Sequence, residues 1–424
     1  MWLAAAGTTA AKAKSCIKTG FFLLFPWDIH RNLLCCIHKA YNPNSGEEKM
    51  KFDYLIVGAG FSGCVMAERI SSILGKRVLI VEQRNHIAGN AYDYFDENGV
   101  LVHKFGPHIF HTNSKKVWDY LSTYTEWTPY YHKVLGMLDG EMVPIPFNLN
   151  TLNQLFPSTS TKAIEDALLD QYKFGEKITI QQLQNNKNKQ LKALADYIYE
   201  KVFHGYTVKQ WGLKPEDLDP SVTGRVPVII SRDNRYFQDK YQALPKHGYT
   251  EMFRRMLNSP NIKVLLNTDY KEIITDVHYN KLIFTGPIDM YFDYKFGQLP
   301  YRSLRFEFEF HNKEEFQEAG QINYPNEYEF TRITEFKKLT HQKNILGTTI
   351  AREYPEAYKI GINDPYYPVP KKEYREQYRL YETEAQTIKD KVIFAGRLAE
   401  YKYYNMDQIV GRALHLFEKE INAG

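Results

Sequence analysis

The 424-residue sequence has few cysteines, no long hydrophobic run and no strong excess of either charge. Its four cysteines, Cys16, Cys35, Cys36 and Cys64, form no CxxC pair, which argues against a disulfide framework or a thiol redox centre and favours a reducing cytoplasm. The longest strongly apolar stretch, residues 20–27, is far shorter than the ~20 residues of a membrane-spanning helix, so no membrane insertion is expected. A net charge of +4 does not indicate a nucleic-acid-binding protein, but it suits anionic small molecules.

Aromatic residues, in contrast, are abundant: 32 tyrosines, 25 phenylalanines and 5 tryptophans make up 15% of the chain. Such rings belong mostly in a core, yet their amphipathic surface can also line a ligand cavity. The length allows two or three domains of ~150 residues. Residues 1–49 differ in composition from the rest, and we expect a disordered leader without chemistry, with a targeting peptide as the alternative.

The apolar pattern after the leader predicts a strand–helix–strand unit. Residues 54–57 form a continuous apolar run typical of a buried parallel strand, residues 61–74 have helical spacing, and residues 78–81 form a second buried strand. Mostly helical structure is expected over residues 148–220. Further strands are expected at 263–266, 281–285, 303–310, 344–349 and 391–395, and a last helix at 407–421.

A glycine-rich turn joins the first predicted strand to the predicted helix. Gly58, Gly60 and Gly63 have the GxGxxG spacing: the first permits a tight turn, the second lets a pyrophosphate approach the backbone, and the third lets helix and strand pack closely. The N–H groups of the helix N-terminus are then available to an anion. Glu82 ends the second strand, where a carboxylate can accept hydrogen bonds from a ribose and disfavours a 2′-phosphate. Together these features predict a dinucleotide-binding site.

Both FAD and NAD satisfy this fingerprint, so the choice depends on other segments. The residues after Glu82, from Gln83 to Asn90, resemble the extension found in FAD proteins of the amine-oxidase and glutathione-reductase superfamily. A C-terminal strand followed by Gly396-Arg397 and a final helix is typical of the returning segment whose helix N-terminus faces the flavin in such folds. The combination favours FAD.

Long motifs rich in Trp, Tyr, His and Arg occur along the chain at 84–92, 106–112, 205–212, 225–228, 286–297, 301–304 and 396–404. In this order they resemble the UDP-galactopyranose mutase family of the bacterial type, over residues 51 to about 421. The leader has no counterpart in that pattern.

The resemblance implies a flavin-dependent isomerase that interconverts UDP-α-D-galactopyranose and UDP-α-D-galactofuranose without net redox change. Reduced FAD is the active form, its N5 acting as the nucleophile on the anomeric carbon with UDP as the leaving group. The resemblance also implies a cytoplasmic homodimer whose product feeds cell-wall and other surface polysaccharides. Two alternatives stay open: an FAD-dependent oxidoreductase of the amine-oxidase-like superfamily, and a non-catalytic flavin-binding remnant.

Catalytic and substrate-binding roles follow from the matching motifs. Arg225 and Arg302 correspond to the family's two arginines on the UDP diphosphate, where a planar guanidinium can bind two oxygens and stabilise the departing charge. Tyr236 and Tyr403 correspond to tyrosines that donate hydroxyl groups to the phosphates. The resemblance assigns Tyr206, Thr207 and Trp211 to the uridine side of the substrate and places Trp211 on a mobile loop.

The cofactor-binding residues include the three glycines of the turn and Glu82. The resemblance places His108 against the isoalloxazine and makes metal binding by His108 and His111 the poorer interpretation, because no Cys or acidic residue lies close by in the sequence. The remaining implied cofactor-binding residues are Phe61, Ser62, Gln83, Arg84, Asn90, Ile109, Arg397, Tyr404, Asn405, Met406, Asp407, Gln408 and Ile409.

Three positions depart from the family pattern. Asn405 stands where the family usually has Asp, Phe330 where it usually has Tyr, and His132 at the position aligned with a substrate-side Asn. We expect these changes to reduce affinity or rate without changing the reaction, since the arginines and the other tyrosines persist.

The expected architecture is α/β and discontinuous: a Rossmann-like FAD-binding domain, a helical domain and an antiparallel β-sheet that forms one wall of the substrate cleft. The FAD-binding part is expected at 50–147, the helical substrate domain at 148–220, a mixed segment with the antiparallel sheet at 221–385, and the completing strand and helix at 386–424.

Overall fold

The computed structural model describes residues 51–219 and 226–422. The predicted leader, 1–49, and Arg225 therefore lie outside the described residues. Residues 51–275 and those from 279 onward form one unit, which contains the elements described below.

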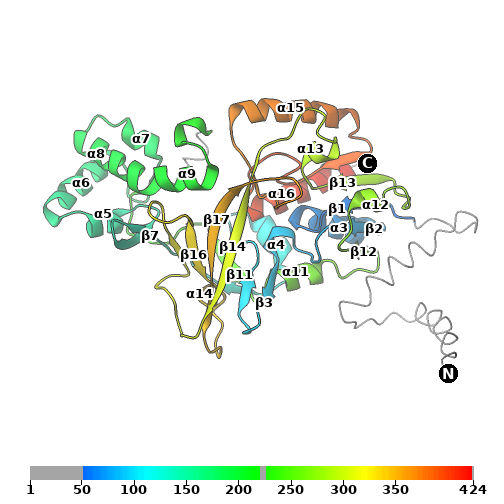
Figure 1. Cartoon of the computed structure of the whole chain (residues 1–424), viewed down its shortest axis with the longest axis horizontal. Coiled ribbons are helices and arrows are strands. Elements are labelled where there is room, and N and C mark those ends of the chain that lie inside the picture. Colours follow the sequence, from blue (N-terminus) through cyan, green and yellow to red (C-terminus); the bar gives the residue numbers. More distant parts are fainter. Residues whose placement is uncertain (1–50, 220–225, 423–424) are drawn as a thin grey trace, which may run out of the picture. The chain divides into compact units, whose positions relative to one another are not determined.

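A five-stranded parallel sheet forms the first layer (Figure 1). Its strand order is β12 (Ile262–Leu265), β2 (Val78–Val81), β1 (Tyr54–Val57), β13 (Lys281–Phe284) and β19 (Val392–Phe394). All four pairings are parallel, and β1 lies in the centre of the sheet, between β2 and β13. The strands predicted at 54–57 and 78–81 are confirmed with those bounds, because apolar side chains buried on both faces leave a continuous hydrophobic run in the sequence.

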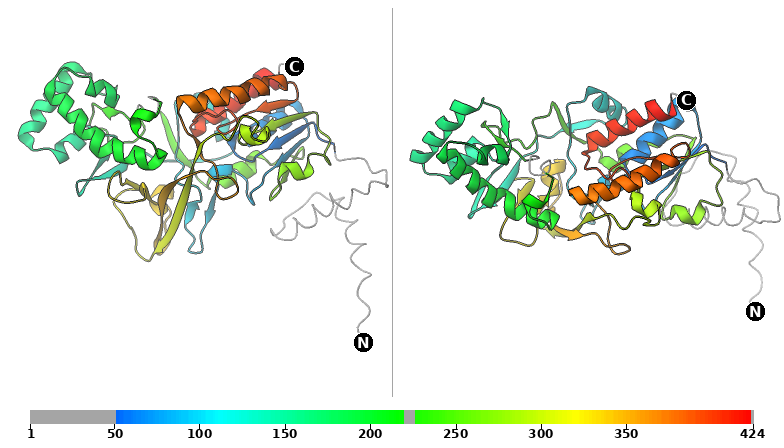
Figure 2. Two further views of the ribbon diagram at one scale, coloured as in Figure 1. Left: turned by 45° about the horizontal axis from the view of Figure 1, so that its top comes forward. Right: turned by 90° about the horizontal axis from the view of Figure 1, so that it is seen from above.

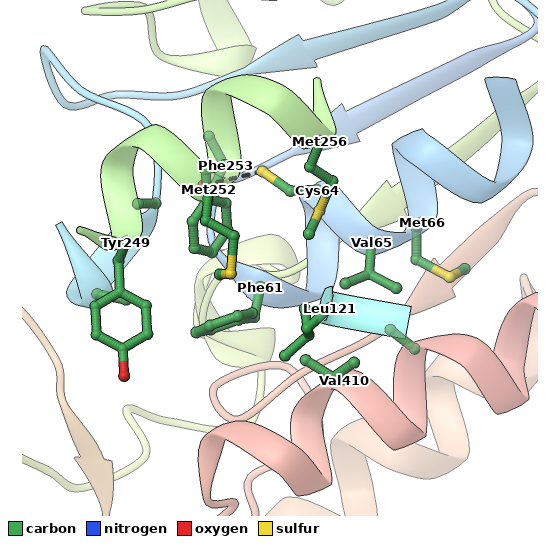
Figure 3. Close-up of a cluster of buried hydrophobic side chains, with 14 of the residues drawn as sticks. Phe61, Cys64, Val65, Met66, Leu121, Tyr249, Met252, Phe253, Met256 and Val410 are labelled. Carbon is green, nitrogen blue, oxygen red and sulfur yellow. Dashed lines mark hydrogen bonds between the residues drawn. The ribbon is translucent and has the colours of Figure 1, made fainter. Parts of the chain in front are cut away.

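Helix α3 (Phe61–Leu74) follows β1 and packs against α16 (Met406–Leu416), close to the end of the chain. Figure 3 shows the apolar side chains of α3 between α11 (Tyr249–Met256), α4 (Lys115–Ser122) and α16. The rings of Phe61 and Phe253 lie 4.7 Å apart, and Cys64, the one free cysteine in the described part of the chain, is fully buried here. This core fixes the glycine-rich turn relative to the C-terminal helix.

A second, seven-stranded sheet is mostly antiparallel. Its order is β18 (Tyr367–Pro368), β14 (Tyr301–His311), β17 (Thr348–Ala357), β16 (Arg332–Glu335), β15 (Gln321–Asn323), β7 (Val134–Leu138) and β8 (Glu141–Ile145). The strand predicted at 344–349 was placed too early, since β17 begins at Thr348. Asn344 and Gly347 have positive φ angles of 64° and 104°, which a strand does not accommodate.

The helices predicted over residues 148–220 are observed: α5 (Leu149–Leu155), α6 (Ser158–Gln171), α7 (Ile180–Gln184), α8 (Lys189–Ile198) and α9 (Gly205–Trp211). A π-helical turn, Tyr199–His204, links α8 to α9. Helices α5 to α8 share a hydrophobic core with β7 and β8, and α9 contacts β17 of the antiparallel sheet. In both views of Figure 2 the helices of this region, coloured teal to green, lie together at one side of the ribbon.

Shorter elements complete the described part of the chain: β3 (Asp93–Phe95), β4 (Leu101–His103), β5 (Phe110–Thr112), β6 (Trp127–Pro129), β9 (Lys177–Ile178), β10 (Val228–Ile229), β11 (Tyr241–Pro245), α12 (Tyr270–Ile273), α13 (Ile288–Tyr291), α14 (Phe336–Thr340) and α15 (Lys372–Thr387). No helix among the described residues combines the length and the apolar character that crossing a bilayer requires. The parallel sheet, the helical layer and the antiparallel sheet agree with the predicted α/β fold class.

Candidate active site

The glycine-rich turn has the geometry that an approaching ligand requires. Gly58 has φ +102°, and a Cβ there would clash with the hydroxyl of Thr285; a Cβ at Gly63 would clash with the carbonyl oxygen of Gly58. Gly60 differs, since its Cβ would lie 3.8 Å from the Cα of Gly89 in ordinary contact. Packing within the protein therefore does not explain the glycine at position 60, whereas the approach of a pyrophosphate does.

Glu82 is held rigidly at the end of β2. One carboxylate oxygen accepts a hydrogen bond from the N–H of Ala59 at 2.9 Å, and the other accepts from the N–H of Arg84 at 3.0 Å. The side chain is buried at the rim of a cavity. A carboxylate fixed in this way can still accept ribose hydroxyl groups, because each oxygen has a second lone pair.

A cavity of about 530 Å³ opens over the N-terminus of α3. Ser62 is buried, and its hydroxyl has no partner among the described residues, while the N-cap residue Gly60 offers no side chain to the first turn of the helix. Unsatisfied donors at a helix N-terminus fit a phosphate group. Of the predicted cofactor-binding residues, those that line this cavity are Gly58, Gly60, Phe61, Ser62, Glu82, Gln83, Arg84, Asn90, His108, Arg397, Met406 and Ile409.

Arg84 connects the glycine-rich side of this cavity to the segment between β17 and β18. Its Nη1 donates to the side chain of Asn90 at 2.9 Å, and its Nη2 lies 3.4 Å from a carboxylate oxygen of Asp364. Residues 358 and 360–366 line the same cavity, with Ile360 and Ile362 strongly exposed at 48% and 77%. This segment was missed by sequence reasoning, since nothing in its composition marks it as a cofactor contact.

A second cavity, of about 480 Å³, lies between α9, the antiparallel sheet and the segment before β11. It contains six of the predicted substrate-binding residues, namely His132, Tyr206, Thr207, Trp211, Tyr236 and Tyr403. It also contains polar residues that sequence reasoning missed: Gln210, Gln321, Asn323, Arg332, Glu353 and Tyr367. The two predicted ligands Ile109 and Asn405 line this cavity rather than the first.

The two cavities share His108, Arg397 and Met406. The Nδ1 of His108 lies 2.8 Å from the carbonyl oxygen of Gly106, so Nδ1 carries the hydrogen and Nε2 keeps its lone pair. Burial, with a smaller contribution from His103, lowers the pKa of His108 to about 3. A neutral imidazole of fixed tautomer therefore lies at the boundary between the two cavities.

Arg397 is held at this boundary by main-chain and aromatic contacts. Its Nη2 donates to the carbonyl oxygen of Tyr404 at 2.7 Å, and its Nη1 donates to that of Tyr366 at 3.3 Å. Its Cζ lies 5.0 and 5.4 Å from the ring centres of Tyr367 and Tyr403, which are themselves stacked 5.1 Å apart. The guanidinium thus places a fixed positive charge where the cavities meet.

Two sequence comparisons bear on this site. Residues 201–403 match the family described as UDP-galactopyranose mutase, and residues 56–124 match the NAD(P)-binding Rossmann-like domain. A Klebsiella pneumoniae protein named "Probable UDP-galactopyranose mutase" is 36% identical over 363 residues, covering 85% of this chain and 92% of its own. The chain belongs to the UDP-galactopyranose mutase family. Membership makes it an enzyme of the isomerase class.

Other family relatives differ in the sugar that they are named for. The UDP-galactopyranose mutase of Mycoplasma pneumoniae is 34% identical over 382 residues, covering 86% of this chain and 95% of its own. The dTDP-fucopyranose mutase of Escherichia coli is 36% identical over 368 residues, covering 85% and 96%. Family membership alone therefore does not distinguish between the two nucleotide sugars.

Solved structures share the fold. A reduced UDP-galactopyranose mutase aligns with a TM-score of 0.68 at 15% identity, covering 88% of this chain and 95% of its own. A double mutant of putrescine oxidase aligns with a TM-score of 0.57 at 11% identity, covering 88% and 100%. These likenesses confirm the predicted fold class, and the second shows that an oxidase can share it.

Two residues that the mutase resemblance assigned to the substrate, Arg302 and Phe330, line neither cavity. A third, Arg225, lies outside the described residues. Phe330 packs instead against Tyr324 and Tyr328, with ring centres 5.0 and 4.9 Å away. The remaining predicted cofactor residues outside both cavities are Gly63, Tyr404, Asp407 and Gln408.

These last residues have structural partners that the mutase motif did not reveal. Asp407 accepts a hydrogen bond from the hydroxyl of Thr112 at 2.9 Å, and the side chain of Gln408 accepts from the N–H of Asn405 at 2.9 Å. They therefore fix the start of α16 beside the first cavity. His111, also in the matched motif, forms a hydrogen bond with Asp239, with 3.0 Å between Nδ1 and a carboxylate oxygen.

Proposed function

We propose that this enzyme interconverts UDP-galactopyranose and UDP-galactofuranose with bound FAD in its reduced form. The observation that carries the proposal is the meeting of the two cavities at His108, Arg397 and Met406. A dinucleotide bound along the glycine-rich turn would extend its ring to this boundary, where the sugar end of a nucleotide sugar would meet it. An isomerase that uses its cofactor as a reactant requires such direct contact.

Reduced FAD, when bound, would supply the nucleophile, its N5, toward the anomeric carbon, with UDP as the leaving group. The N–H groups at the start of α3 and the hydroxyl of Ser62 would hold its pyrophosphate. Glu82 would accept hydrogen bonds from its ribose, and that carboxylate would disfavour a 2′-phosphate. His108, being neutral, would contact the ring without adding a second positive charge beside Arg397.

The nucleotide is assigned to the second cavity. Tyr206, Thr207 and Trp211 of α9 form its uridine side, while Tyr236 and Tyr403 offer hydroxyl groups to the diphosphate. The described positively charged side chains that line it are Lys177, Arg332 and Arg397, and these support binding of an anionic substrate.

Arg225 and Arg302 remain proposed ligands of the departing diphosphate. In the structure Arg302 donates to carbonyl oxygens at the end of α9, so binding a phosphate requires its guanidinium to exchange these partners. Such an exchange would couple arrival of the substrate to the position of α9.

A UDP-galactose substrate has two lines of support. Relatives from Klebsiella and Mycoplasma bear that name. In addition, His132, Gln321 and Asn323 give the cavity polar groups that can hydrogen-bond a sugar hydroxyl. A dTDP-fucose substrate is the second candidate, because the Escherichia coli relative named for it is equally similar.

The test uses the full-length purified protein. Its absorbance spectrum is recorded to detect flavin, and the protein is then incubated with UDP-galactofuranose before and after dithionite reduction. We expect UDP-galactopyranose to form only in the reduced sample, with lower kcat/KM for the dTDP-fucose pair. Oxygen or acceptor consumption without isomerisation would instead identify an oxidoreductase, and bound flavin with neither activity would identify a non-catalytic protein.

We further propose that the enzyme works in the cytoplasm as a homodimer and feeds synthesis of galactofuranose-containing surface polysaccharide. Light scattering coupled to size-exclusion chromatography tests the dimer, with a mass near twice the 49.7 kDa of the chain as the expected result.

A further inference from the structure

The segment between β17 and β18, residues 358–366, runs along the first cavity and is joined to β14 at both of its ends. At one end the N–H of Tyr358 donates to the carbonyl oxygen of Tyr301 at 3.2 Å. At the other end the N–H of Tyr366 donates to the carbonyl oxygen of Arg302 at 2.8 Å. Tyr301 and Arg302 are adjacent, so the two ends of this 358–366 loop lie close together, as in the compact surface loops that often carry a function.

The middle of the loop is held together by its own hydrogen bonds. The side chain of Asn363 accepts from the N–H of Lys359 at 2.8 Å and donates to the carbonyl oxygen of Ala357 at 3.0 Å. The N–H of Ile362 donates to the carbonyl oxygen of Lys359 at 3.1 Å. Hydrogen bonds from residues 359–365 reach no described residue outside the loop except Ala357, at the end of β17. The loop is therefore a compact unit with few attachments, and such segments open at a low free-energy cost.

One ion pair joins the loop to the opposite wall of the cavity. The Nη2 of Arg84 lies 3.4 Å from a carboxylate oxygen of Asp364, and both side chains are partly exposed. Arg84 is itself fixed, since its Nη1 donates to the side chain of Asn90 at 2.9 Å and its Cζ lies 4.7 Å from the ring centre of Phe105. A partly exposed pair at this distance is weak, so it can break and re-form as the loop moves.

Two isoleucines of the loop are exposed to water at the cavity. Ile360 and Ile362 line it with 48% and 77% of their surface exposed, and neither belongs to a hydrophobic cluster of the described residues. A single exposed aliphatic side chain is ordinary, but two on the rim of one cavity offer apolar surface to a ligand that fills it. Covering that ligand would remove the apolar surface from water and thereby strengthen binding.

The loop crosses the middle of the cavity. Asp364 lies next to Arg84, two residues after Glu82, on the glycine-rich side. Tyr366 lies at the boundary with the second cavity, where its carbonyl oxygen accepts a hydrogen bond from the Nη1 of Arg397 at 3.3 Å. A dinucleotide that extends from the glycine-rich turn to this boundary would therefore pass along the loop.

We propose that the 358–366 loop is a lid for the bound dinucleotide: Ile360 and Ile362 cover the ligand, and the pair of Arg84 with Asp364 holds the loop closed. The inference deepens the proposed function and rests on it for the identity of the dinucleotide, FAD. The lid slows release of the flavin while nucleotide sugars enter and leave the second cavity.

The rate at which the purified holoenzyme releases FAD after dilution, followed by the fluorescence of free FAD, tests this lid. Ile360→Ser with Ile362→Ser should raise the rate at least about 10-fold, because these side chains no longer bury apolar surface on the ligand. The matched control is Ile73→Ser with Leu380→Ser, which removes two aliphatic side chains that are 52% and 51% exposed and line neither cavity. The control should release FAD at the wild-type rate.

Wild-type release from the double isoleucine variant would overturn the proposal and leave these side chains to a protein partner. Equal acceleration in the control would overturn it as well. Thermal melting of each holoenzyme confirms that the variants are folded.

The ion pair is tested separately. Asp364→Asn should accelerate FAD release about 2- to 5-fold, the effect of a partly exposed ion pair. Asp364→Glu keeps the carboxylate and should release FAD more slowly than Asp364→Asn. Equal rates for the wild type and Asp364→Asn would refute the part that the ion pair plays in closing the lid.

Closure itself is measured by limited trypsin digestion with and without FAD. Lys359 is an exposed residue of the loop, and FAD should slow cleavage there at least ~5-fold more than at Lys76, an exposed lysine outside both cavities. The double isoleucine variant should show less protection of Lys359. Equal protection of the two lysines in the wild type would overturn closure of the loop over the ligand.

The outcomes separate this inference from the proposed function, because FAD release and digestion are measured apart from isomerisation. A protein that binds FAD under the lid but isomerises neither nucleotide sugar supports the lid and refutes the mutase assignment. An isomerising protein whose loop variants release FAD like the wild type does the reverse. A protein that binds no FAD on reconstitution overturns both.

Discussion

The Nε of Arg302 donates a hydrogen bond to the backbone carbonyl oxygen of Gln210, with 2.8 Å between the two atoms. A second bond joins its Nη2 to the carbonyl oxygen of Lys209 at 3.2 Å. The last carbonyl groups of a helix lack partners within the helix, and a cation there also interacts favourably with the helix dipole. Arg302 therefore stabilises the C-terminal end of α9, just where Gly212 ends the helix with φ +67°.

Replacing Arg302 by Ala should loosen this end of α9. Charge-assisted bonds to carbonyl groups are worth about 1.5–3 kcal/mol each, so local opening should become at least ~10-fold more frequent. Limited trypsin digestion, followed at Lys209 in the last turn of α9, is expected to be accelerated without UDP, while Arg302→Lys shows an intermediate rate. Unchanged cleavage in Arg302→Ala would show that the guanidinium does not hold the helix.

Replacing Gly60 and replacing Gly63 should have different effects on thermal stability and on flavin content. Gly60→Ala meets no clash within the protein, so its thermal stability without cofactor should equal that of the wild type while flavin content falls at least ~10-fold. Gly63→Ala forces a Cβ against the carbonyl oxygen of Gly58, and both stability and flavin content should fall. Flavin released per protein and the melting temperature of the apoprotein measure the two effects. Equal flavin content in Gly60→Ala and the wild type would refute a pyrophosphate contact there.

Buried histidines should make the fold sensitive to acid. Burial lowers the pKa of His103 to about 4, below its ordinary 6.5, so between these values the unfolded chain binds more protons than the native one. Stability should therefore fall as the pH drops from about 6.5 towards 4, by up to about 3 kcal/mol from this residue.

His103→Asn keeps an acceptor for the N–H of His108, which His103 Nδ1 binds at 3.0 Å, and removes the titrating group. Its unfolding free energy, from urea titrations between pH 5 and 7, should depend less on pH than that of the wild type. His247→Asn, at an exposed position, serves as the control and should retain the wild-type slope. A slope unchanged in both variants would contradict the assignment to His103.

The two departures at Asn405 and Phe330 should affect the reaction unequally. Asn405 lines the second cavity next to Met406, whereas Phe330 lies in an aromatic group outside both cavities. Asn405→Asp is therefore expected to raise turnover modestly, by less than about 10-fold, and Phe330→Tyr to leave it unchanged. Steady-state kinetics of the two single variants and the double variant decide this, and a gain that requires Phe330→Tyr would contradict the placement.

Local sequence signals predicted the strand–helix–strand unit and its glycine-rich turn. The glycine spacing and Glu82 are consecutive features of one strand–helix–strand unit, so their geometry follows from local structure. The resemblance brought Tyr206, Tyr236 and Tyr403 to one cavity from three distant segments, which periodicity alone could not do.

The contacts that could not be predicted from the sequence depend on strand register and on side-chain orientation. Arg332 and Glu353 face each other because β16 and β17 pair in one register, which a sequence without homologues does not reveal. Arg302 lies in a matched motif, yet its rotamer places the guanidinium at α9 rather than in the cavity. A motif match places a residue near the site, and the packing around that residue determines which atoms its side chain contacts.

The boundary formed by His108, Arg397 and Met406 also has a consequence for how often the enzyme must be reduced. Under the proposed function, a nucleotide sugar in the second cavity would meet the flavin only at this boundary, so the product could leave while the flavin stays bound. One reduction would then serve many catalytic cycles, and the enzyme's demand for electrons would be set by how fast air reoxidises it rather than by how much sugar it converts.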